Sequence, residues 1–182
     1  MDAFETIVGQ YLEAKGYWVR HSVKVGIIKE EKKAIGTPTM PRPEIDLVAL
    51  RVEKNELMLI EAKSMLDAQV GLDIQTFTDK EARYKNRYKL FTKPEFRKVV
   101  ERRLKKEYLD QGLINDDTTI RYGLAVGKIR KRDKKKIEEH FSRNGWVLFM
   151  RQDIKNTLSK LSEKSWEDDV VTMTAKLLLK DE

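Results

Sequence analysis

Two short apolar runs joined by a turn constrain the fold of this chain more than any other feature of its sequence. The runs are EIDLVALRV (44–52) and ELMLIEAK (56–63), and the turn residues Lys54 and Asn55 lie between them. Each run has the length of a strand and is rich in aliphatic and β-branched residues. The pattern therefore predicts an antiparallel β-hairpin.

The segments around this hairpin alternate between helical and strand patterns. Before the hairpin we expect a helix over Phe4–Leu12 that ends near Gly16, a strand over 17–29, and an irregular loop over 30–43 that contains three prolines. After the hairpin we expect a helical stripe from Val70 to Phe91, a helix from Phe96 to Tyr108, and a strand over 118–129. The C-terminal part is expected to contain a helix within 131–141, a short strand over 146–149, and two helical patterns, Ile154–Leu161 and Trp166–Leu177. This order predicts an α/β fold in which helices flank a mixed central sheet. Residues 1–150 are expected to form one domain, with 151–182 as a helical extension packed on it.

Composition narrows the chemistry that the chain can carry. It has 182 residues, no cysteine, only two histidines and a formal net charge of +7. Thiolate metal sites, disulfides and cysteine nucleophiles are excluded, so a bound metal would be held mainly by oxygen ligands. The positive charge favours an anionic partner, although acidic residues are also abundant.

The sequence contains no apolar run of membrane-spanning length, and Met1-Asp2 begins no signal peptide. We therefore expect an intracellular, cytoplasmic protein with no membrane partner. Phosphate-binding loops of the Walker type and a nucleophile elbow are also missing from the sequence, which argues against nucleotide hydrolysis and serine chemistry.

Three charged residues of the hairpin are predicted to share one sheet face. If the turn is centred between Lys54 and Asn55, Asp46 pairs with Lys63 and Glu61 lies on the same face. Charges on a face that is otherwise apolar need a compensating partner. A hard divalent cation is one such partner, with Asp46 and Glu61 as ligands and Lys63 beside the attacking water or the phosphate. The alternative is a cross-strand Asp46–Lys63 ion pair with a solvated Glu61.

The hairpin motifs, PEIDLVAL at 43–50 and IEAKS at 60–64, resemble those of the PD-(D/E)XK nuclease superfamily, which has the restriction-endonuclease-like fold. The resemblance implies an αβββαβ core, and it implies that Asp46 and Glu61 are metal-binding acids and Lys63 is the catalytic lysine. It also implies Mg²⁺ as cofactor, with Mn²⁺ able to replace it. The name-giving Pro-Asp is Pro43-Glu44 in this chain, and the aspartate follows two residues later.

Three further residues are candidates for the site: Glu5 as a metal ligand, and Glu44 and Gln75 as accessory residues. Glu44 lies on the predicted face of Asp46. Glu5 matches a metal-associated glutamate that several superfamily members carry on the first helix, but Asp2-x-x-Glu5 is also a capping-box pattern. Gln75 resembles a glutamine that some branches of the superfamily carry in the helix after the hairpin. Those branches have a tyrosine four residues later, where this chain has Asp79.

A basic run at 128–136 (KIRKRDKKK) is the candidate nucleic-acid contact. Its residues Lys128, Arg130, Lys131, Arg132, Lys134 and Lys135 would bind phosphates, or would form only a solvated helix start. We expect a metal-dependent nuclease, an endonuclease acting on DNA. The first rival hypothesis is a nuclease-like module that binds DNA or a protein without cutting. The second is an interaction protein whose basic surface binds RNA or a ribonucleoprotein. A dimer contact through the C-terminal helices stays open.

Overall fold

The structure is a computed structural model that describes residues 2–39, 41–165 and 167–180. Its helices and strands, in chain order, are α1 (Ala3–Glu13), β1 (Trp18–Lys24), α2 (Lys29–Ala34), β2 (Glu44–Arg51), the 3₁₀ turn η1 (Val52–Lys54), β3 (Glu56–Lys63), α3 (Gln75–Thr78), the 3₁₀ turn η2 (Lys85–Arg87), α4 (Lys89–Thr92), α5 (Pro94–Asp110), β4 (Thr119–Val126), the 3₁₀ turn η3 (Lys131–Asp133), α6 (Lys134–Arg143), β5 (Val147–Met150), α7 (Arg151–Ser162) and α8 (Val170–Leu179).

The strands form one five-stranded mixed sheet in the order β1-β2-β3-β4-β5. The first two pairs, β1–β2 and β2–β3, are antiparallel, whereas β3–β4 and β4–β5 are parallel. A parallel pair needs a crossover connection, and the segment containing α3, α4 and α5 supplies it between β3 and β4. The predicted α/β class with a mixed sheet and extra C-terminal helices is confirmed.

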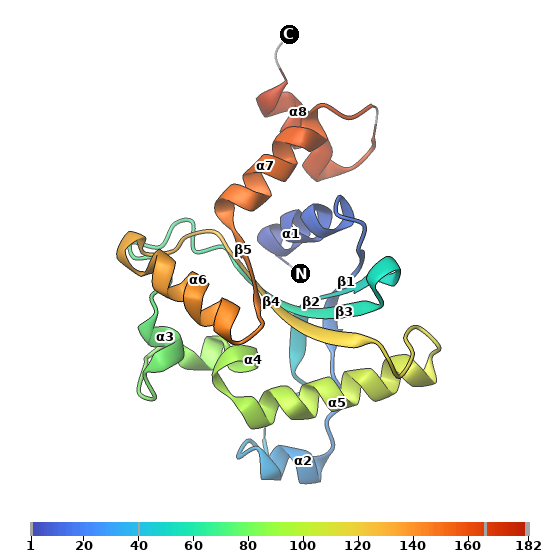
Figure 1. Cartoon of the computed structure of the whole chain (residues 1–182), viewed down its shortest axis with the longest axis vertical. Helices are drawn as coiled ribbons and strands as arrows, with labels where there is room; N and C mark the ends of the chain where they lie inside the picture. The colour runs from blue at the N-terminus through green and yellow to red at the C-terminus, as the bar shows by residue number, and fades with distance from the viewer. Residues whose placement is uncertain (1, 40, 166, 181–182) are drawn as a thin grey trace.

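Helices cover both faces of the sheet (Figure 1). On one face, α1 and α7 pack against alternate strand residues such as Leu47, Met58 and Ile60. On the other face, α4, α5 and α6 pack against residues such as Leu57, Leu59 and Leu124. The sheet therefore separates two apolar cores, and α8 lies outside α1 and α7 (Figure 1).

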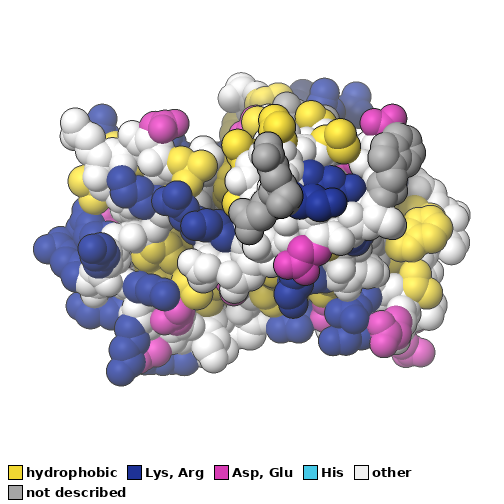
Figure 2. All heavy atoms as spheres, turned by 90° about the horizontal axis from the view of Figure 1, so that it is seen from above, with side chains coloured by type: hydrophobic (Ala, Val, Ile, Leu, Met, Phe, Trp, Pro, Cys, Tyr) yellow, Lys and Arg dark blue, Asp and Glu magenta, His cyan; other side chains and the backbone are white. Residues whose placement is uncertain are grey.

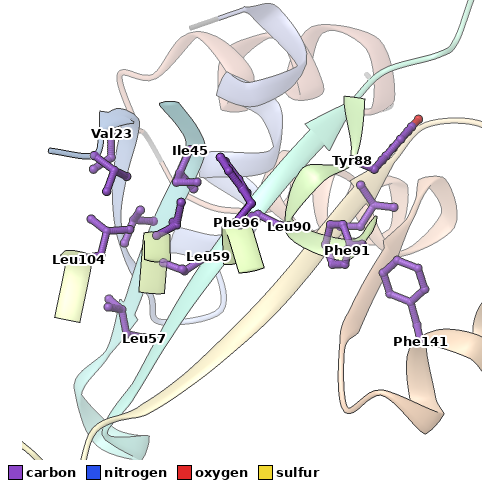
Figure 3. Close-up of a cluster of buried hydrophobic side chains, with 14 of the residues drawn as sticks. Val23, Ile45, Leu57, Leu59, Tyr88, Leu90, Phe91, Phe96, Leu104 and Phe141 are labelled. Carbon is purple, nitrogen blue, oxygen red and sulfur yellow. The ribbon is translucent and has the colours of Figure 1, made fainter. Parts of the chain in front are cut away.

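The larger core contains the segment that later contacts the candidate site. Figure 3 shows Leu90 and Phe91 of α4 and Phe96 of α5 in the same cluster as Leu59 of β3. Leu90 is fully buried, so the short helix α4 is held firmly against the sheet.

Two predictions of local structure are wrong. The segment 30–43 was expected to be irregular because of its prolines, but α2 occupies Lys29–Ala34, before the first proline at position 38. The stripe from Val70 to Phe91 is not one helix. It is divided into α3, η2 and α4, because its apolar side chains are buried by a folded connection rather than by one continuous face.

The other predicted elements are present, but the strand expected over 17–29 ends at Lys24. The last helix, α8, begins at Val170, and Trp166 lies outside the described residues. Over the ranges that the structure describes, none of the helices combines the length and apolar character that crossing a bilayer requires.

Candidate active site

The register of the β2–β3 hairpin differs from the predicted one. Leu47 pairs with Ile60 and Ala49 with Met58, so continuing the ladder places Asp46 opposite Glu61 rather than opposite Lys63. The turn is longer than expected because η1 precedes Asn55, which adopts a left-handed conformation (φ 47°). A shift of two residues keeps the face of every side chain, so Glu61 and Lys63 stay on the predicted face.

Asp46 lies where the alternation of β2 breaks. Ile45 and Leu47 should share a face, yet they belong to the two different cores. Opposite Asp46 in the β1–β2 register is Ser22, whose φ of 51° is a left-handed conformation inside a strand. A backbone reversal of this kind is costly for a serine and is typical of positions that aim a functional group.

Because of this break in the alternation, the Asp46 carboxylate accepts hydrogen bonds from residues of the same hairpin. Its Oδ2 accepts a hydrogen bond from the Ala62 main-chain amide at 2.8 Å and another from Lys63 Nζ at 2.7 Å. The side chains of both Asp46 and Lys63 are half-buried. The Asp46–Lys63 ion pair of the alternative interpretation is therefore present.

The other half of that alternative, a solvated Glu61, is wrong. Glu61 is only 8% exposed, and its Oε1 accepts a hydrogen bond from the Leu90 amide at 3.2 Å. Its other oxygen, Oε2, is buried without a hydrogen-bond partner among the described residues. Burial raises the pKa of Glu61 to about 7, although the nearby Lys63 ammonium and the Leu90 amide oppose this rise.

Asp46, Glu61 and Lys63 all line one cleft of about 320 Å³. Three more cations, Arg42, Arg87 and Lys89, also line it, and none of them was among the residues predicted for the site. The run RYKNRYK at 83–89 was a signal for two of these cations, but it was assigned to a helical stripe. The cleft is therefore lined by both carboxylates and cations.

The oxygen groups of the cleft fit a hard divalent cation with an incomplete protein shell. Asp46 and Glu61 provide carboxylates, and the orphan Oε2 of Glu61 lacks the partner that a buried carboxylate oxygen needs. In the parts of the chain that the structure describes, no group of three or more His, Asp or Glu side chains is arranged to hold a metal ion. Water and substrate would have to supply the other ligands, as is usual for Mg²⁺.

Glu5 is not placed as the metal-ligand prediction required. Its Oε2 accepts a hydrogen bond from the Asp2 amide at 3.0 Å, and the Asp2 carboxylate caps the Glu5 amide at 2.8 Å. This reciprocal pair is a capping box. The helix α1 also packs on the sheet face opposite to Glu61. The capping alternative is confirmed, and Glu5 leaves the candidate ligand set.

Of the two accessory candidates, Glu44 and Gln75, only Glu44 lies at the cleft. Glu44 lines the cleft beside Asp46, so it remains a candidate. Gln75 is an exposed residue at the start of α3 and is not among the described residues that line the cleft. Its neighbour Asp73 accepts hydrogen bonds from the amide and the hydroxyl of Thr76.

The basic run divides into two groups. Lys128 donates to the carbonyl of Ala68, and Arg130 lies 3.5 Å from Asp73, so both have structural contacts. Lys131, Lys134 and Lys135 are exposed, as is Arg132, which lies 3.9 Å from Asp133. Figure 2 shows Lys and Arg side chains gathered at the left of the molecule, the end at which α3 and α6 lie in Figure 1.

Comparisons with known proteins name no family and no activity. No protein-family model matches the sequence, and no curated protein matches it either. The crystal structure of the protein of unknown function AF1548 is similar over 98% of this chain and 70% of that chain, with 16% sequence identity and a TM-score of 0.42. This similarity assigns no function.

Proposed function

We propose that the protein is a metal-dependent nuclease that hydrolyses phosphodiester bonds in DNA. The observation that carries this proposal is Glu61, a buried carboxylate whose Oε2 has no hydrogen-bond partner in the described chain, in the same cleft as the Asp46–Lys63 pair. A purely structural carboxylate would be solvated or fully bonded, because an unpaired buried charge is costly.

Each of the three hairpin residues has a distinct proposed role. Asp46 and Glu61 would hold a divalent cation, Mg²⁺ or Mn²⁺, which lowers the pKa of a bound water and offsets charge on the scissile phosphate. Lys63 is fixed by Asp46 at 2.7 Å, so its ammonium is held at the cleft and can orient the water or neutralise the phosphate.

The cationic side chains that line the cleft suit a polyanion. Arg42, Arg87 and Lys89 place positive charge around the two carboxylates, which favours entry of a phosphodiester backbone. The exposed basic residues of η3 and the start of α6 would extend this contact to neighbouring phosphates.

The direct test is a cleavage assay with Mg²⁺ or Mn²⁺ over duplex, flap, branched and single-stranded DNA and RNA. Glu61→Gln and Lys63→Ala should abolish cutting. Glu53→Gln and Lys54→Ala, at the exposed turn end of the same hairpin, are matched controls that should cut like the parent. Binding without cutting on every substrate would contradict the nuclease and favour the silent DNA-binding module.

A further inference from the structure

A second cavity adjoins the candidate active site. It has a volume of about 460 Å³ and shares two cationic side chains, Lys63 and Arg87, with the first cleft. Both hollows are bordered by Lys63 and Arg87. A nucleic-acid phosphate bound between these two cations would therefore have one adjacent part of the substrate in the first cleft and another in the second cavity.

The walls of the second cavity are chemically different from those of the first. Met65, Val70, Leu72 and Tyr88 give it an apolar lining, and the Tyr88 hydroxyl contacts the Met65 sulfur at 3.4 Å. Asp73 and Arg130 provide polar groups. A flat ring with apolar faces and a polar edge matches such a lining.

An exposed aromatic residue lies at this cavity. Tyr84 is 44% exposed, although large aromatic side chains are usually covered in a folded chain. The guanidinium groups of Arg83 and Arg87 lie 5.3 Å and 5.1 Å from its ring centroid. An exposed aromatic ring with guanidinium groups beside it combines the stacking surface and the positive charge that bind unpaired bases.

The floor of the cavity is fixed in place. Leu72 forms a bridge with Ile129 beyond the end of β4, through hydrogen bonds from Leu72 to Lys128 and from Arg130 to Leu72. A Cβ at Gly71 would lie 2.8 Å from the Lys128 carbonyl oxygen, so only glycine allows this approach. The cavity is therefore preformed, and Lys128 and Arg130 serve to build it.

We infer that this cavity binds an unpaired nucleobase of the nucleotide whose phosphate lies between Lys63 and Arg87. The inference rests on the proposed function and names its substrate class, a nucleic acid with a single-stranded segment at the cleavage point. A base within a duplex is paired and stacked, so its entry would first cost unpairing. Single strands, flaps and frayed ends avoid this cost.

The test is binding measured by fluorescence anisotropy in EDTA, so that no cutting occurs. The probes are a labelled oligodeoxythymidine, a blunt duplex of equal length and an abasic strand of equal length. Tyr84→Ala should weaken binding of the oligodeoxythymidine by roughly tenfold, since one base stack is lost. Binding of the duplex and of the abasic strand should stay within about twofold, because phosphate contacts remain.

Two variants serve as controls. Tyr84→Phe keeps the ring and should bind the oligodeoxythymidine like the parent. Trp18→Ala removes another exposed aromatic residue, 77% exposed on β1 and not among the residues that line either cavity, and should change nothing.

The two proposals fail separately. If Tyr84→Ala binds all probes like the parent while cleavage proceeds, the base-binding cavity is overturned and the nuclease stands. If Tyr84→Ala weakens all three probes equally, the residue contacts backbone and the inference is also overturned. If the base-dependent loss appears but no substrate is cut, the cavity is supported and the nuclease fails.

Discussion

The main-chain amide of Leu90 donates to Oε1 of Glu61 at 3.2 Å and thereby ties α4 to the candidate active site. The carbonyl of the same residue accepts from Arg97 Nη1 at 2.8 Å. The Arg97 guanidinium also lies over Tyr122 and Trp146, at 5.4 Å and 5.1 Å from their ring centroids. Arg97 is thus a positioning residue that holds Leu90, and through it Glu61.

Arg97→Ala should therefore destabilise the protein. The buried Leu90 carbonyl would lose its charged donor, which costs about 1–3 kcal/mol. Urea unfolding measures this loss. Lys98→Ala, the next residue on α5 and an exposed one, is the control and should change stability by less than about 0.5 kcal/mol. Equal stability of the two variants would show that Arg97 does not hold α4.

The raised pKa of Glu61 predicts a pH-dependent stability. Its pKa is about 7 in the folded protein and 4.5 as its ordinary value, so folding favours the protonated form. Below pH 4.5 the group is protonated in both states and carries no penalty. As pH rises from 4.5 to 7 the folded protein progressively loses stability relative to a chain with a neutral side chain, and the loss levels off above pH 7.

Glu61→Gln should consequently stabilise the metal-free protein at pH 8, by about 3 kcal/mol, and hardly at all near pH 4.5. Thermal unfolding of parent and variant in EDTA at both pH values measures the difference. Glu53→Gln, at the exposed end of the hairpin, is the control variant. A Glu61→Gln effect of equal size at both pH values would mean that ionisation of Glu61 is not the cause.

The same group should couple metal binding to proton release. A cation requires the ionised form of Glu61, so Mn²⁺ affinity should rise by roughly tenfold per pH unit below pH 7 and level off above it. Calorimetry in two buffers of different ionisation enthalpy measures the released proton at pH 6. Asp46→Asn should abolish binding. An affinity that does not vary between pH 6 and pH 8 would contradict this coupling.

The sequence predicted the fold class well because its strands carry a clear alternation. In β3, Leu57 and Leu59 belong to one core and Met58 and Ile60 to the other, as expected. The segment between β3 and α5 was not predictable in this way. Its apolar residues have spacings of three, four and seven, but they are buried by several short turns, so the spacing indicated one helix wrongly.

The candidate site was predictable in its three central residues and not in its details. Glu61 and Lys63 kept their face because the register error was an even number of residues. The hydrogen bond from the Ala62 amide to Asp46 depends on the break in the side-chain alternation of β2, which lies opposite Ser22. No turn residue in the sequence marks that break. The contact of Leu90 with Glu61 joins residues that are far apart in the chain, which local patterns do not report.

Catalysis and DNA binding should be separable by mutation. Lys63→Ala removes one ammonium at the scissile phosphate, so it should abolish cleavage while largely preserving affinity for DNA. Neutralising Lys131, Arg132, Lys134 and Lys135 together should weaken binding of every sequence. It should also flatten the salt dependence, because each lost phosphate contact lowers the slope of log affinity against log salt by about one. A salt titration of both variants, beside a cleavage time course, measures both effects. If the fourfold variant binds like the parent at every salt concentration, the basic run is only a solvated helix start. If Lys63→Ala cuts at the parental rate, the hairpin does not carry the catalytic site.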